Sequence, residues 1–145
     1  MSEPERGSFL RALGLRRAPA PDGVDVVFEL DLDRSLLNSR DGLQGGLVAT
    51  LIDIAAGFAA LQGTAGDKST ATSNLTVHYL SAVTVGPARA EATRLRSGRT
   101  SVVVDVKVYD VGRDKLAATS TVAFAVLELR PGQSEPGRTP PHLLS

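Results

Sequence analysis

The sequence contains no cysteine and no tryptophan, and only two of its residues are histidine. The absence of cysteine excludes disulfide bonds, a thiol nucleophile and thiolate metal ligands. With His78 and His142 as its only histidines, the chain is a poor candidate for a histidine-based metal site or for a Ser-His-Asp triad. We therefore expect no bound metal, and no chemistry that depends on a thiol or on a triad.

Aromatic residues make up 4% of the chain and hydrophobic residues 42%, so the core has to be built from Val, Leu and Ala. Sixteen basic residues balance sixteen acidic ones, which argues against a broad basic surface for nucleic acid. The first seven residues are polar and charged, unlike a signal peptide. With a length of 145 residues, the chain suits one domain, and we expect a soluble, cytoplasmic protein.

The most informative segment covers residues 36–63, where a polar loop leads through a glycine-rich turn into an apolar run. Large apolar residues recur in this run at helical spacing. They are Leu47, Leu51, Ile54, Phe58 and Leu61. The opposite side carries mostly small residues, so we expect a helix that is buried on both sides, by the sheet on one side and by another element, such as a partner subunit, on the other. The run is shorter than the about 20 apolar residues of a membrane span and has a charge at its centre.

That charge is Asp53, the only carboxylate of the chain with such apolar neighbours. A buried carboxylate needs a partner or a raised pKa, and such groups are often functional, although a structural tie to a hydroxyl or a backbone donor would explain it equally well. Gly45 and Gly46 fall where the helix should begin. Unpaired N–H groups and the helix dipole favour an anion or a polarised carbonyl oxygen there, and a plain tight turn is the structural alternative.

Gly45 and Asp53 lie eight residues apart, which is about 12 Å along a helix axis that rises about 1.5 Å per residue. The two residues cannot both touch one carbonyl group within one chain. Two antiparallel helices related by a two-fold axis would place Gly45 of one chain beside Asp53 of the other. If both residues serve one site, the protein is at least a dimer with two equivalent sites.

Residues 1–23 form an N-terminal segment, with a short helix over 8–15 and a connector over 16–23. Residues 24–32 alternate as a half-buried strand, with Glu29 and Asp31 on a solvated face.

Four further strands follow the helix and are joined mostly by short turns, which makes neighbouring strands antiparallel. They cover residues 70–80, 88–96, 100–110 and 115–129. A domain over residues 24–129 thus combines one long helix with an antiparallel sheet in an α+β arrangement. Residues 130–145 are rich in proline, and we expect a disordered tail.

Several of these residues together resemble the active-site segment of hotdog-fold acyl-CoA thioesterases, in particular the phenylacetyl-CoA thioesterase-like group. The resemblance rests on Asn38, Gly42, residues 43–46, Asp53, residues 72–75 and residues 79–80. It covers residues 24–129 and implies a hotdog fold, an antiparallel sheet wrapped around one long central helix, in a homodimer or a homotetramer. It implies no cofactor beyond the CoA that belongs to the substrate.

The resemblance also implies a role for each matched residue. Gly45 N–H polarises the thioester carbonyl, and Asn38 helps to place that carbonyl or the water. Asp53 of the other subunit acts as a general base or as a nucleophile, and Thr72 orients the water. Gln44 stands where the family has the His of its His-Gly-Gly pattern, and an amide cannot carry a proton at neutral pH.

Other candidates would bind the substrate. CoA phosphates attract cations, which singles out Arg40 beside the glycine turn and Arg96 and Arg99 at a hairpin, although a solvated surface explains each of them as well. Gly46 would let the substrate approach the helix start. Tyr79 and Phe58 could line an acyl pocket, and core packing explains both equally well.

The leading hypothesis is hydrolysis of an acyl-CoA thioester to a free acid and CoA. Gln44 in place of the family His supports an alternative, a non-catalytic hotdog protein that binds acyl-CoA or a related ligand or serves as a scaffold. A hydratase or dehydratase ranks last, because such enzymes usually pair a His with an acid and no His lies near Asp53 in the sequence. We expect neither nucleic acid nor a membrane as a partner.

Overall fold

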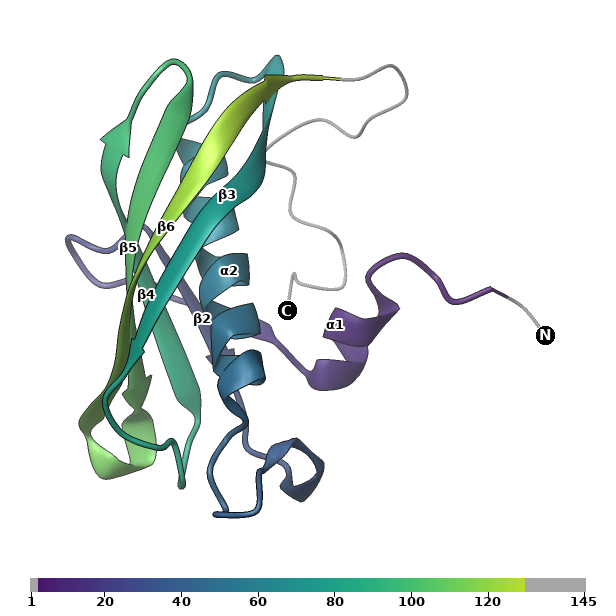
Figure 1. Cartoon of the computed structure of the whole chain (residues 1–145), viewed down its shortest axis with the longest axis vertical. Coiled ribbons are helices and arrows are strands. Elements are labelled where there is room, and N and C mark those ends of the chain that lie inside the picture. Colours follow the sequence, from purple (N-terminus) through teal and green to yellow (C-terminus); the bar gives the residue numbers. More distant parts are fainter. Residues whose placement is uncertain (1–2, 130–145) are drawn as a thin grey trace.

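The computed structural model describes residues 3–129, so the predicted disorder of residues 130–145 lies outside the described residues. One long helix lies against a single curved sheet, as the resemblance implies (Figure 1). The elements are α1 (Ser8–Leu13), β1 (Arg16–Ala18), β2 (Val26–Leu30), α2 (Gly45–Gln62), β3 (Lys68–Tyr79), β4 (Ala88–Ser97), β5 (Ser101–Asp110) and β6 (Lys115–Glu128). Single 3-10 turns cover Arg34–Leu36 and Val111–Arg113.

The sheet has six strands in the order β1-β2-β4-β5-β6-β3, and every neighbouring pair is antiparallel, as predicted. Alternate residues of β5 are valines without exposed surface, and alternate residues of β4 are alanines without exposed surface. They are Val102, Val104, Val106 and Val108, and Ala88, Ala90 and Ala92. Because successive side chains of a strand point to opposite faces, this alternation gives the sheet one continuous apolar face. That face receives α2.

α2 begins at Gly45, where the glycine turn predicts it, and ends at Gln62. The side of α2 that packs on the sheet consists mainly of alanine. Its buried members are Val48, Leu51, Ile52, Ala55, Ala56, Ala59 and Ala60. Within one chain the sheet buries only one side of α2, and cover of the other side by a partner subunit stays a prediction. Leu47, Ile54, Phe58 and Leu61 are only partly buried, because a single sheet covers one side of the helix.

By length and composition, α2 is the one helix among residues 3–129 that could cross a membrane. It contacts β2, β3, β4, β5 and β6, and the middle of its sheet-facing side has no exposed surface. α2 therefore occupies the position of a core helix.

The N-terminal segment contributes to the sheet, which corrects the prediction of a connector. Residues 16–18 form β1, which pairs with β2. The prediction that Glu29 lies on a solvated face is also wrong, because its side chain is only 11% exposed and pairs with Arg16 at 3.4 Å and with Arg89 at 2.9 Å. Asp31 remains exposed and binds Arg16 at 2.6 Å. Strands on both sides of β2 thus supply the arginines that cover Glu29.

Asp110, at the end of β5, is a fully buried carboxylate that fixes the loop between β3 and β4. Its Oδ2 accepts hydrogen bonds from the N–H groups of Thr84 at 2.9 Å and Val85 at 3.3 Å, and its Oδ1 accepts one from Gly86 at 2.7 Å. Burial raises the pKa of Asp110, but the three backbone donors and the nearby charge of Arg113 together outweigh burial and hold that pKa below its usual value of 3.8. The charged form of Asp110 therefore stabilises the fold.

We expect Asp110→Ala to lower the free energy of unfolding by about 3 kcal/mol, because three N–H groups lose their acceptor. The folded-state pKa is lowered, so the stabilisation by Asp110 is complete above the unfolded-state pKa and is lost as the pH falls through the folded-state pKa. Urea unfolding between pH 7 and about pH 3 should show a steeper loss of stability on acidification for the native protein than for the variant. Asp105→Ala, in the same strand, is the control. An equal decrease of the free energy of unfolding in the two variants would contradict the prediction.

Candidate functional site

The loop that leads into α2 is organised by Asn38. Its side-chain Oδ1 accepts hydrogen bonds from the N–H groups of Arg40 at 2.9 Å and Gly42 at 3.2 Å, and its own N–H donates to the Gly42 carbonyl at 2.8 Å. Such turns, in which a side chain replaces a backbone acceptor, are typical of Asn. The side-chain oxygen of Asn38 is thus engaged in holding the loop that sets the first residue of α2.

Gln44 is the N-cap residue of α2, and its side chain is exposed and caps no backbone N–H group. Its backbone carbonyl accepts from the N–H groups of Leu47 at 2.9 Å and Val48 at 3.1 Å. The N–H groups of Gly45 and Gly46 come before these and have no acceptor within the helix. A side chain at Gly46 would have no neighbour within 4 Å. The start of α2 therefore offers N–H donors, with the partial positive charge of the helix dipole, to a ligand that can come close.

Tyr79, at the end of β3, holds the first turn of α2 in place. Its hydroxyl donates to the Gly45 carbonyl at 2.6 Å, and its ring lies 3.5 Å from the position that a Cβ of Gly45 would take. The sequence left two interpretations of Tyr79 open, the wall of an acyl pocket and core packing. In the structure Tyr79 contacts the helix start and does not line the groove beside Asp53.

Asp53 lies in the middle of α2, partly buried, and its Oδ1 accepts a hydrogen bond from the Thr72 hydroxyl at 2.8 Å. The structure thus supplies the hydroxyl partner that the apolar surroundings of Asp53 require. Thr72 lies on β3 immediately before a bulge, where the pairing with β6 shifts between Thr72 and Asn74. A bulge changes the direction in which neighbouring side chains point. The alternation of residues in the sequence did not predict this bulge.

A groove of about 250 Å³ runs along α2 beside Asp53. Residues of α2 form one wall, and residues of β3 and β6 form the other. The lining consists of Asp53, Ile54, Gly57, Phe58, Leu61, Thr70, Thr72 and Phe124. Phe58, which the sequence suggested for an acyl pocket, packs against Phe28 in a tilted arrangement with ring centroids 5.2 Å apart. The guanidinium of Arg17 lies over the Phe58 ring, 5.7 Å from its centroid. The groove is therefore polar at Asp53 and Thr72 and mainly apolar elsewhere.

The candidate cations for CoA lie at opposite ends of α2. Arg40 is exposed in the loop before the helix, whereas Arg96 and Arg99 are exposed at the hairpin between β4 and β5. A Cβ on Gly63, just after the helix, would lie 2.4 Å from the Ser97 hydroxyl oxygen, so this hairpin packs on the helix end. An 18-residue helix is about 27 Å long, so within one chain these cations do not meet.

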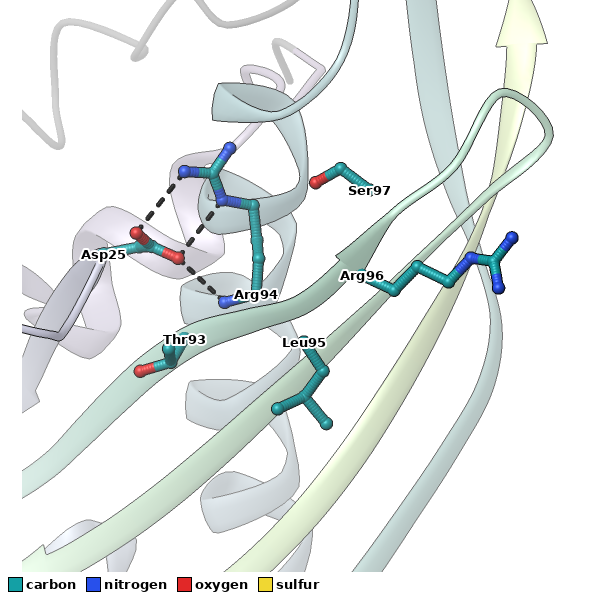
Figure 2. A pocket seen from close by; sticks show the side chains of 6 residues that line it. All are labelled: Asp25, Thr93, Arg94, Leu95, Arg96 and Ser97. Atoms are coloured by element: carbon teal, nitrogen blue, oxygen red, sulfur yellow. Dashed lines mark hydrogen bonds and ion pairs between the residues drawn. The ribbon is translucent and has the colours of Figure 1, made fainter.

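The hairpin also forms a hollow of about 290 Å³ that is lined by Asp25, Thr93, Arg94, Leu95, Arg96 and Ser97. Figure 2 shows Arg94 directed at Asp25, with Arg96 pointing away from that pair. The side-chain hydrogen bond from Arg94, at 3.1 Å, holds the pKa of Asp25 below its usual range. Arg94 is thus committed to a structural ion pair, which leaves Arg96 as the cation available to a ligand. Among residues 3–129, no group of His, Asp or Glu side chains is arranged to hold a metal ion.

The model of the thioesterase superfamily matches residues 43–117, which include the helix start, Asp53 and Thr72. Over 110 residues the chain is 34% identical to the Caenorhabditis elegans protein named "Putative esterase F42H10.6". That alignment covers 75% of this chain and 64% of the relative, so the chain spans less than two thirds of the relative's length.

Two solved structures extend the comparison. Thioesterase HI1161 from Haemophilus influenzae superimposes with a TM-score of 0.78 at 19% identity, over 88% of this chain and 89% of that chain, which shows a shared fold. The BH2602 protein from Bacillus halodurans, whose structure contains CoA, superimposes with a TM-score of 0.65 at 30% identity. This match covers 70% of this chain and 66% of that chain.

We expect Tyr79→Phe to lower the free energy of unfolding by about 1 kcal/mol, because the variant keeps the ring and loses the hydrogen bond to the Gly45 carbonyl. Amide exchange at Ala49, whose N–H donates to the same carbonyl in a regular helix, should become faster. Urea unfolding and hydrogen exchange test both effects. Tyr109→Phe is the matched control, since its hydroxyl forms no hydrogen bond within the described residues. Equal behaviour of the two variants would contradict the assignment.

Proposed function

The chain belongs to the thioesterase superfamily, and we propose that it hydrolyses an acyl-CoA thioester to a free acid and CoA. The superfamily and the esterase name of the C. elegans relative support hydrolysis of thioesters in general. The CoA in the Bacillus halodurans structure supports CoA as the thiol part of the substrate. The observation that carries the proposal is the Asp53–Thr72 hydrogen bond at the polar part of an otherwise apolar groove.

Asp53 serves as the general base. Thr72 holds Oδ1, which leaves Oδ2 to take a proton from a water molecule. The water oxygen bonds to the thioester carbonyl carbon, and the carbonyl oxygen gains negative charge. When this intermediate collapses, the C–S bond breaks and the sulfur of CoA takes the proton from Asp53. Water is the only co-reactant, so the reaction requires no cofactor.

The developing negative charge needs a donor, and the N–H of Gly45 at the start of α2 provides one. Asn38 acts through the loop that it holds, and Gly46 leaves space for the substrate. Gly45 and Asp53 of one chain lie eight helical residues apart, about 12 Å along the axis. We therefore assign the Gly45 N–H and the Asp53 carboxylate of each site to two chains of a two-fold dimer.

The same dimer brings the candidate cations together. When two helices run antiparallel, the start of one lies near the end of the other. Arg40 of one chain would then share the mouth of the site with Arg96 and Arg99 of the other, although these residues lie at opposite ends of α2 within one chain. Three cations from two chains match the phosphates of the CoA nucleotide.

The second candidate function is binding of an acyl-CoA without turnover, in this dimer or in a dimer of dimers. Gln44 favours it, because this residue replaces the His of the resembled pattern, is exposed, and caps no backbone group of α2. In this case the groove and the cations would serve binding alone.

Asp53→Asn separates the two functions. We expect the native protein to release CoA from at least one member of a panel of short, medium, long and aromatic acyl-CoAs in a thiol-release assay. Asp53→Asn should lower kcat by about 10²- to 10⁴-fold, because an amide does not accept the proton of water. Asp105→Asn should retain activity, and unchanged melting temperatures would show that both variants fold. Absence of turnover by the native protein, with acyl-CoA still bound, would favour the second function.

Mixing two inactive variants tests the site between two chains. Gly45 is the first residue of α2, and the backbone of Gln44 before it is extended (φ −56°, ψ 135°), so Gly45→Pro removes the N–H with little strain. In a mixed dimer of Asp53→Asn and Gly45→Pro chains, one site contains both native residues and the other contains neither. Half of the randomly mixed dimers are of this kind, so we expect about a quarter of the native activity to return. A site within one chain predicts no recovery.

A further inference from the structure

Gly57 occupies an unfavourable place for glycine, the middle of α2, four residues after Asp53. Glycine in a helix interior lowers helix stability relative to alanine, because it has more backbone freedom to lose on folding. The other residues of α2 between Val48 and Gln62 include no glycine. The presence of glycine at this one position therefore needs a physical reason.

Packing within the chain does not supply that reason. A Cβ at Gly57 would meet one atom within 4 Å, Cε1 of Phe124 at 3.9 Å, which is ordinary van der Waals contact. Gly63 at the end of the helix is different, since a Cβ there would come within 2.4 Å of the Ser97 hydroxyl oxygen and 2.6 Å of Arg94 Nη1. The fold has room for a side chain at position 57 and not at position 63.

The space at Gly57 belongs to the groove beside Asp53. Gly57 lies about 6 Å further along the helix axis than Asp53, on the same side, because four residues make about one turn. Around it are Phe58, Leu61 and Phe124, so a group in this space contacts apolar carbon. A thioester whose carbonyl lies at Asp53 would place the carbons several bonds beyond that carbonyl over Gly57.

We propose that Gly57 sets the size of the acyl group that the site accepts, and that the substrates are acyl groups long or broad enough to extend over it. This inference rests on the proposed thioester hydrolysis at Asp53. The missing side chain leaves room for acyl carbons to lie on the helix backbone and against the Phe124 ring. An acetyl group ends before this space and does not use it.

Gly57→Ala and Gly57→Val test the proposal with acetyl-, hexanoyl-, decanoyl- and phenylacetyl-CoA. We expect kcat/KM for hexanoyl- and larger acyl-CoAs to fall by at least about 10- to 200-fold in Gly57→Val, because this is the range for a misfit of a single methylene in an apolar pocket and valine adds three carbons. The value for acetyl-CoA should stay within about twofold, since the added methyl groups lie beyond its reach. Gly57→Ala should lose less activity and gain a few degrees in melting temperature.

Gly66→Ala and Gly66→Val are the matched controls. Gly66 is exposed in the loop after α2, a Cβ there would meet nothing within 4 Å, and it does not line the groove. Equal losses for all acyl-CoAs in the Gly57 variants, or a change in oligomeric state on gel filtration, would assign the space to packing between chains and overturn the inference. Unchanged selectivity would overturn it as well.

A binding measurement separates failure of this inference from failure of the proposed function. S-hexyl-CoA is a thioether that cannot be hydrolysed, and titration calorimetry compares its affinity with that of CoA. We expect Gly57→Val to weaken S-hexyl-CoA at least tenfold and to leave CoA unchanged. If the native protein cleaves no thioester and this difference is still found, hydrolysis is wrong and the role of Gly57 stands. If S-hexyl-CoA binds both proteins equally, the role of Gly57 is wrong.

Discussion

The close contact between the alanine-rich side of α2 and the apolar face of the sheet is the constraint on which the rest of this structure depends. Ala55, Ala56, Ala59 and Ala60 have no exposed surface, and they face strands whose inward residues are valine and alanine. Small residues on both surfaces allow the helix to lie near the sheet. Leu51 and Ile52 are buried in the same contact, whereas Ile54, Phe58 and Leu61 lie beside it and form one wall of a groove. The way the core packs thus produces the groove beside Asp53.

Much of the fold was predictable because its signals are local. The glycines at 45 and 46 mark the start of α2, and the alternating valines of β5 mark a strand with one buried face. β1 was missed because three residues are too few to show a period. The burial of Glu29 was missed because its arginine partners lie 13 and 60 residues away in the chain, and sequence alternation records only the strand itself.

The site was predictable in its parts and not in its contacts. A carboxylate among apolar residues drew attention to Asp53 without any knowledge of the fold. Its hydrogen bond with Thr72 joins residues 19 positions apart, and that between Tyr79 and Gly45 joins residues 34 positions apart, so both depend on how β3 lies along α2. The sequence showed Gly57 only as one of several small residues beside Asp53, because a sequence cannot show whether the space next to a glycine is filled.

The bulge in β3 connects these two contacts. Before it, the even-numbered Thr70 and Thr72 face α2, and after it the odd-numbered Leu75, Val77 and Tyr79 do. Thr72 and Tyr79 are separated by an odd number of positions, so a regular strand would turn one of them away from the helix. The extra residue at Ser73 lets a single strand support both the carboxylate and the helix start. Deletion of one residue at the bulge would still allow β3 to pair regularly with β6, but only one of the two side chains, Thr72 or Tyr79, would then reach α2. Sheet pairing alone therefore does not require the extra residue in β3, whereas the two contacts with α2 do.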